Sequence, residues 1–398
     1  MIKKLKIIIF IRQSGDYDWV SGFLRKNISR ADFTIYLHAG TSRLAPDFAT
    51  LIREEFSSKE LEIICGPIVP KYLDRCYEYI FRVVDKVGRK FTPLKINLSS
   101  FIRPILKFIL NNSLRLGGAD VILVSNSHHR DLSFETICAL SPAMKLVIFP
   151  HAPGIFSAFV YSKTWILNDF DLWIESCCLS DWSLSHDRSK VAFVGLQDNF
   201  CKYKSQSVNK KNSIILILQK RADITGMSLE ELRKFFYSVI LKSKSYGMSI
   251  DIKQHPHSNY EMNSLAKELR SLGCKILPPI LKKTDYLNYH LCIGMWSTFN
   301  IYFVAAGIPV LVVMPEKYNS NLTLSKFDVS FYFDNAKESL TNKYFDSGLV
   351  HRISSTDELD SLLSDKSALD ALYFEQQESF SRYWPYSEMF DVIQKKLF

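Results

Sequence analysis

Three loops of the sequence combine basic or hydroxyl side chains with residues that end a strand. In the first loop, His151 lies between Pro150 and Pro153 and follows the apolar run Lys145–Phe149. Because imidazole titrates near neutral pH, a histidine on a stiff loop at the end of a strand is a candidate general base. The alternative is a turn histidine bonded to backbone, and this loop alone does not decide between the two.

The second loop has a cationic cluster at the end of another predicted strand. Lys253, His255 and His257 lie within five residues, and Pro256 stiffens the turn. Fixed positive charge in a dry site stabilises the diphosphate of a departing nucleotide, so Lys253 and His255 are predicted to bind donor phosphate. Metal binding by the two histidines is disfavoured because the loop contains no carboxylate or cysteine. No motif found in the chain requires a metal or another cofactor.

The third loop, Gly294–Thr298, precedes a helix that is expected to open at Ser297. Serine and threonine commonly cap helix starts, and the same geometry directs N–H groups and hydroxyls toward an anion. The loop follows the cationic cluster by about 40 residues in the same predicted sheet. We therefore predict that Ser297 and Thr298 complete a phosphate site with Lys253 and His255.

Two other polar segments are weaker candidates. His128, His129 and Arg130 follow a predicted strand. They are expected to line the part of the site that binds the acceptor, the molecule that receives the transferred group. Asp169 and Asp171 have the spacing of a metal-binding pair, but they precede a strand instead of following one. A structural role is predicted for this pair.

Short apolar runs alternate with helix-like segments along the chain, as in α/β proteins with a parallel sheet. A polar, basic stretch over residues 200–212 interrupts the alternation and is predicted to be a linker. The sequence thus predicts two doubly wound Rossmann-like domains facing each other across a cleft, with ligands at the carboxyl ends of the strands. The strands are predicted at Leu5–Phe10, Phe33–Leu37, Leu61–Cys65, Val121–Val124, Leu146–Phe149, Leu172–Glu175, Ser213–Leu218, Ser249–Lys253, Cys274–Leu277, Leu291–Gly294 and Pro309–Val313.

Composition restricts the cellular setting. The eight cysteines are scattered without a CxxC pair, which indicates free thiols in a reducing compartment. The apolar run Ile7–Ile11 is too short for a signal peptide core, and no stretch is long enough to cross a bilayer. A cytoplasmic protein is expected.

The net charge of +9 is concentrated between Lys86 and Gly118, where seven lysines and arginines occur without an acidic residue. Apolar residues are interleaved with these charges, which suits the anionic inner face of a cell membrane. The alternative is a helix packed in the core with solvated lysines. Nucleic acid is not expected as a partner, because no recognisable binding module accompanies the charge.

The motifs of the second half resemble those of the GT-B transferases of bacterial surface polysaccharides. The nearest resemblance is to the CDP-glycerol glycerophosphotransferases of teichoic acid and capsule synthesis. Lys253-Gln254-His255-Pro256 is similar to their Lys-Pro-His-Pro strand end, and Ser297-Thr298 to their Ser-Ser turn. Pro150-His151-Ala152 matches their His-Gly motif in part. CMP-sialic acid and CMP-Kdo transferases share the His-Pro and Ser-Thr features.

The resemblance implies a GT-B fold and transfer of a sugar or polyol-phosphate from a CDP- or CMP-linked donor. The acceptor would be a growing surface glycan or a lipid-linked glycan, and His151 would be the base. A UDP-sugar-dependent glycosyltransferase, a nucleotide-sugar epimerase and a non-catalytic member of a capsule assembly complex remain as alternatives. The expected domains are an acceptor domain over 1–205, a donor domain over 206–380, and a C-terminal helix over 381–398 that packs across their junction.

Overall fold

The computed structural model describes most of the predicted sheets and the whole C-terminal region. The described residues are 4–11, 14–37, 50, 52–56, 61–65, 72–73, 76–77, 79–80, 118–125, 135–136, 139, 143–150, 170–178, 188–197, 212–222, 227–255, 258–278, 289–295, 297, 299–313 and 347–398.

The chain divides into two compact units, each built around one sheet. The first unit consists of Met1–Ala152, Phe156–Asp198 and Tyr386–Phe398, and the second of Pro153–Ile155 and Asn199–Pro385. No helix in the described ranges combines the length and apolar character that crossing a bilayer requires.

The sheet of the first unit has the order β3-β2-β1-β4-β5-β6-β7, and its neighbouring strands are parallel. Its strands are β1 (Leu5–Ile11), β2 (Ala31–Leu37), β3 (Leu61–Cys65), β4 (Val121–Ser125), β5 (Lys145–Phe149), β6 (Leu172–Glu175) and β7 (Val191–Phe193). The central strands are buried along their length, as expected when helices cover both faces of a parallel sheet.

Helix α1 (Ser14–Asn27) packs on one face of this sheet through aromatic side chains. The Trp19 ring stacks on Phe149 with centroids 5.5 Å apart, and Phe23 meets Phe33 edge-on at 5.7 Å. The strand residues that point to the opposite face, including Ile8 and Trp173, form a buried cluster there. Both faces of the sheet are therefore apolar.

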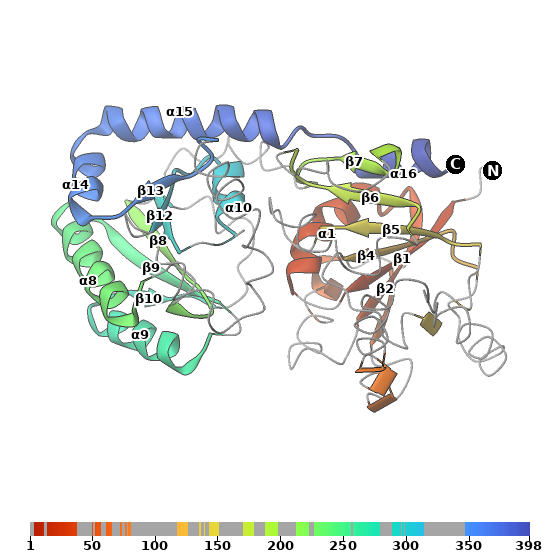
Figure 1. The fold of residues 1–398 in the computed structure, drawn as a ribbon, viewed down its shortest axis with the longest axis horizontal. Helices are drawn as coiled ribbons and strands as arrows, with labels where there is room; N and C mark the ends of the chain where they lie inside the picture. The colour runs from red at the N-terminus through yellow and green to blue at the C-terminus, as the bar shows by residue number, and fades with distance from the viewer. Residues whose placement is uncertain are drawn as a thin grey trace, which may run out of the picture. The chain divides into compact units, whose positions relative to one another are not determined.

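The second unit contains a parallel sheet with the order β10-β9-β8-β11-β12-β13 (Figure 1). Its strands are β8 (Ser213–Leu218), β9 (Ser249–Gln254), β10 (Lys275–Ile276), β11 (Leu291–Gly294), β12 (Val310–Val313) and β13 (His351–Ile353). The first strand in sequence is central and later strands add on either side, which is the doubly wound arrangement.

Helices cover both faces of the second sheet (Figure 1). Helices α8 (Leu229–Ser245), α9 (Tyr260–Ser271) and α14 (Thr356–Ser364) enclose a core with alternate residues of the strands, such as Leu216 and Ile252. Helix α10 (Asn300–Ala305) packs against β11 and β12 and against α15 (Lys366–Tyr383). The predicted α/β class with two parallel sheets is confirmed.

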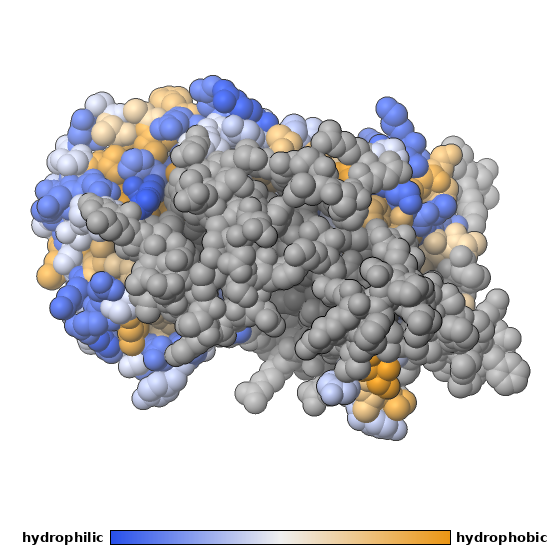
Figure 2. Space-filling view, viewed as in Figure 1, coloured by the Kyte–Doolittle hydropathy of each residue, from blue (hydrophilic) through white to orange (hydrophobic). Residues whose placement is uncertain are grey.

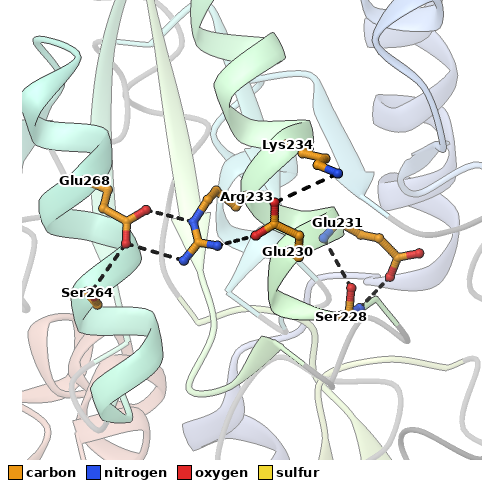
Figure 3. Close-up of polar contacts among 7 residues, drawn as sticks. All are labelled: Ser228, Glu230, Glu231, Arg233, Lys234, Ser264 and Glu268. Carbon is orange, nitrogen blue, oxygen red and sulfur yellow. Dashed lines mark hydrogen bonds and ion pairs between the residues drawn. The ribbon is translucent and has the colours of Figure 1, made fainter.

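Polar contacts fix the start of α8 and its contact with α9 (Figure 3). Ser228 and Glu231 form a reciprocal capping box, in which each side chain accepts a hydrogen bond from the backbone N–H of the other residue, at 3.2 and 2.7 Å. Arg233 pairs with Glu230 on its own helix and donates from Nε to Glu268 of α9 at 2.8 Å.

The C-terminal segment returns to the first unit. Helix α15 ends at Tyr383 and α16 (Met389–Leu397) begins after Pro385, so the range 381–398 contains the end of one helix and the whole of another. Gln197 binds the backbone of this segment by accepting from Met389 N at 3.0 Å and donating to Ser387 O at 3.0 Å.

Candidate functional site

The carboxyl ends of β8, β9 and β11 lie side by side in the second unit. β8 is paired on one side with β9, where Ile217 is opposite Lys253, and on the other side with β11. Met295 N, just beyond β11, donates to Ile217 O at 3.0 Å and extends this pairing. Side chains that follow these three strands therefore start from neighbouring points on one edge.

Lys253 is the residue that joins these strand ends. Its side chain is only 7% exposed, and its ammonium lies 4.5 Å from the centre of the Phe299 ring. An ammonium withdrawn from water is stabilised by an aromatic face. The lysine thus reaches from β9 across β8 to the loop that follows β11.

Ser297 belongs to that same loop. Its Oγ accepts a hydrogen bond from Phe299 N at 3.2 Å, and its carbonyl oxygen accepts one from Asn300 N at 3.1 Å. The turn that presents the Phe299 ring to Lys253 is thus built on Ser297. The structure brings Lys253 and Ser297, two of the predicted donor-site residues, to the same edge of the sheet.

The predicted helix start at Ser297 is wrong by three residues. Helix α10 begins at Asn300, and no side chain caps it. Ser297 lies in the preceding turn, because its Oγ and carbonyl oxygen bond to that turn's own N–H groups. A phosphate at this loop would therefore meet a turn and not the N-terminus of a long helix.

Gly294 and Asn300 determine the shape of this turn. A Cβ on Gly294 would lie 2.5 Å from Asn300 Oδ1, so any larger residue at the end of β11 would displace the Asn300 side chain. Asn300 is fully buried, and its Nδ2 donates to Met295 O at 3.1 Å. Asn300 thereby fixes the chain direction immediately before Ser297.

His255 is half-buried and follows the end of β9. Its carbonyl oxygen accepts hydrogen bonds from Ser258 N at 3.0 Å and Ser258 Oγ at 2.8 Å. These bonds form the turn into α9, whose N-cap is Asn259. His255 is therefore two residues from Lys253 at the same edge, on a loop held by backbone contacts.

The loop after β8 contains cations that sequence reasoning missed. Lys220 is exposed and Arg221 is half-buried, and both follow β8 directly. The loop is held on both sides, because Asn259 N donates to Lys220 O at 3.0 Å and Gln219 N donates to Met295 Sδ at 3.3 Å. The signal was the sequence Gln-Lys-Arg immediately after a predicted strand.

Several predicted site residues lie outside the described residues. They are His151, Thr298, His128, His129 and Arg130, together with His257 and the segment 86–117. Two of the strands that lead to them are described. Ser125 and Phe149 end β4 and β5 and lie opposite each other in register. The roles given to these residues remain predictions.

A structural role was predicted for Asp169 and Asp171, and the contacts of Asp171 agree with it, whereas Asp169 lies outside the described residues. Asp171 accepts from Leu146 N at 2.8 Å and pairs with Lys145 Nζ at 3.1 Å, and so ties the starts of β5 and β6 together. In the portion of the chain that the structure describes, no three histidine, cysteine or acidic side chains are grouped as metal ligands.

Comparison with known proteins identifies the fold. No family model matches the chain, and no curated protein matches it in sequence. Among solved structures, a putative UDP-N-acetylglucosamine 2-epimerase from Listeria monocytogenes aligns with a TM-score of 0.55 and 14% identity, over 99% of this chain and 95% of that one. The UDP-GlcNAc 2-epimerase of Neisseria meningitidis bound to UDP-GlcNAc gives 0.54 and 13%, over 99% of both chains.

A third similar structure is TcCGT1 in complex with UDP, with a TM-score of 0.56 and 9% identity over 99% of both chains. Identities this low show the fold alone. None of the three structures is described as a CDP-glycerol transferase, so that narrower resemblance stays a prediction. The chain has the GT-B-like, two-sheet α/β fold that it shares with these proteins.

Proposed function

We propose that the protein is an enzyme that binds a UDP-linked sugar, with the diphosphate at the carboxyl edge of the second sheet. One observation is central to this proposal. Lys253 is buried, and its ammonium reaches the loop of Ser297 through the Phe299 ring. Three strand ends thus supply an ammonium, a hydroxyl and the cations Lys220 and Arg221 near one place.

This arrangement suits a departing nucleotide diphosphate. When the bond between the anomeric carbon and the diphosphate breaks, negative charge increases on the phosphate oxygens. A preorganised ammonium stabilises that charge more in a site withdrawn from water than in bulk solvent. The three similar solved structures are described as UDP- or UDP-sugar-related proteins, which supports UDP over the CDP- or CMP-linked donors.

Transfer of the sugar to an acceptor hydroxyl is the reaction we propose. The acceptor oxygen attacks the anomeric carbon, UDP leaves with the bonding electrons, and a base takes the hydroxyl proton. His151, after β5 in the first unit, remains the proposed base. Its proline-flanked loop and the titration of imidazole near neutrality are the reasons for this choice.

Epimerisation of a nucleotide sugar is the second candidate, and buried carboxylates in the first unit favour it. Asp16, in the first turn of α1 after β1, and Glu175, at the end of β6, are both fully buried. Carboxylates at the carboxyl edge of a sheet suit proton abstraction from a sugar carbon. Glu175 also accepts from Trp173 Nε1 at 2.5 Å, which gives it a structural function as well.

A thermal-shift screen with UDP, CDP, CMP and GDP tests the donor. A nucleotide at 100 times its dissociation constant stabilises its target by about 2.7 kcal/mol. We expect the largest shift with UDP. A larger shift with CDP or CMP would favour the polyol-phosphate interpretation, and no shift with any nucleotide would favour a non-catalytic role.

Incubation with UDP-GlcNAc without an acceptor separates the two reactions. An epimerase converts the sugar alone, which proton NMR detects as a 2-epimer or its elimination product. A transferase leaves the sugar configuration unchanged and releases UDP only when an acceptor is added.

A further inference from the structure

Lys253 differs in its burial from the other cations of the second unit. Figure 2 shows hydrophilic residues over much of the described surface of this unit, at the left of the view. Among the residues that the structure describes, no other lysine or arginine is buried. A lysine has a long, flexible stem and a strongly hydrated ammonium, which usually extends into water. A neighbouring group is therefore needed to hold the Lys253 ammonium at the strand end.

The ring of Phe299 is suited to hold this charge. Its centre lies 4.5 Å from Lys253 Nζ, which is within the roughly 6 Å over which an aromatic face attracts a cation. The attraction is stronger at sites from which water is excluded. The burial of Lys253 and the position of the ring thus favour the same contact.

The Phe299 ring is itself fixed in place by two buried rings of α10. Tyr302 and Phe303 meet it edge-on, each with its centroid 5.7 Å away. The backbone of Phe299 is also held, because its N–H donates to Ser297 Oγ at 3.2 Å. The ring therefore offers the ammonium a defined position beside the loop of Ser297.

We propose that Phe299 is a positioning residue, which holds the Lys253 ammonium at the strand end before the nucleotide binds. This inference rests on the proposed function of the site, since the diphosphate is the group that would meet the positioned charge. Ordering one flexible side chain at the moment of binding lowers affinity by roughly 2- to 12-fold. With the ammonium already held by the ring, this ordering takes place on folding and does not weaken nucleotide binding.

Titration calorimetry of UDP binding to variants at Phe299 tests the proposal. Phe299→Leu keeps apolar bulk but lacks an aromatic face, so its UDP affinity should fall about fivefold. Phe299→Tyr retains the aromatic face and should bind nearly as the wild type does. Phe235→Leu, which removes a buried ring of α8, is the control and should leave UDP affinity unchanged.

The double variant Lys253→Met/Phe299→Leu separates positioning from a direct contact between the ring and the nucleotide. If the ring acts through the ammonium, the double variant should bind UDP as weakly as Lys253→Met alone. Costs that add in full would show that the ring acts independently of Lys253, and would overturn the proposal. Equal UDP binding by the wild type and Phe299→Leu would also overturn it, while leaving the proposed function intact.

Acylation of lysines by an amine-reactive ester tests the contact between Lys253 and Phe299 without any nucleotide. Mass spectrometry of peptides should show that Lys253 reacts much more slowly than Lys234, whose side chain is 76% exposed. In Phe299→Leu the rate at Lys253 relative to Lys234 should rise several-fold, because the ammonium then reaches water more often. An unchanged ratio would overturn the proposal, whereas absence of UDP binding by the wild type would contradict the proposed function instead.

Discussion

Close packing between two residues shapes the loop on which Ser297 lies. The absence of a side chain at Gly294 allows Asn300 to approach the end of β11 and to bond Met295 O. Ser297 and Phe299 stand between these two anchors, so the position of the Phe299 ring over Lys253 depends on them. A residue without a side chain thereby contributes to the geometry of the proposed site.

Gly294→Ala should destabilise the second unit by about 2 kcal/mol, because its Cβ would overlap Asn300 Oδ1. Urea unfolding measures this cost. In an Asn300→Ala background the overlap is removed, so the cost of Gly294→Ala should fall well below its value in the wild type. If Gly294→Ala lowered the free energy of unfolding equally in both backgrounds, the overlap with Asn300 would not be the cause of the destabilisation.

Sequence reasoning found Lys253 and Ser297 because Lys253 ends a predicted strand and Ser297 closely follows another, both at the expected edge of a parallel sheet. It missed the partnership of Lys253 with Phe299, since that contact crosses β8 and depends on the order of strands in the sheet. Strand order is a long-range property that local pattern does not determine. Lys220 and Arg221 could have been predicted in the same way as Lys253 and Ser297, because they directly follow the predicted strand Ser213–Leu218.

At the scale of elements, the start of α8 depends on its capping box. The hydrogen bonds with the Ser228 side chain and backbone lower the pKa of the Glu231 carboxyl below its ordinary value. A lowered folded-state pKa means that the stabilisation is present above the pKa of the unfolded chain. It is lost as the pH falls through the folded-state value.

Ser228→Ala should therefore lower the free energy of unfolding by about 1 kcal/mol at neutral pH. The difference from wild type should shrink in acid, as Glu231 is protonated. Ser238→Ala, an exposed serine in the same helix, is the control and should change little. A constant difference between pH 7 and the acid limit of folding would contradict this account of the cap.

The buried strands were predicted closely from sequence, and the edge strands β7 and β13 were not. Leu172–Glu175, Ser213–Leu218 and Leu291–Gly294 have the predicted bounds, because short apolar runs bounded by polar or turn residues are typical of strands buried on both faces. β7 and β13 are three-residue strands, and β13 begins with an exposed histidine. β7 and β13 form because they pair with β6 and β12, and the local pattern of apolar residues does not predict such pairing.

At the scale of the whole molecule, the end of the chain completes the first unit. Helix α16 buries Met389, Phe390 and Ile393. Arg30 of the α1–β2 turn lies over the Phe390 ring at 4.3 Å and pairs with Asp391 at 2.6 Å. Residues more than 350 positions apart in the sequence thus share one core, which sequence pattern alone suggested only as a returning tail.

Phe390→Ala should destabilise the first unit by about 3 kcal/mol, through lost burial and a residual cavity. Phe398→Ala is the matched control, since that ring is 68% exposed and should be nearly neutral. Differential scanning calorimetry of Phe390→Ala should show that the first unit unfolds at a lower temperature than in the wild type. A shift of equal size in both variants would mean that α16 does not anchor the tail.

Titration calorimetry of UDP binding to Lys253→Met tests the central claim most directly. Methionine retains most of the buried volume and removes the charge, and Lys234→Met, at an exposed lysine of α8, is the control. A hydrogen bond from a charged group contributes about 1.5–3 kcal/mol, so affinity should fall roughly 10- to 100-fold in Lys253→Met. Lys234→Met should bind as the wild type does. Undiminished UDP binding by a folded Lys253→Met variant would contradict the proposed phosphate site.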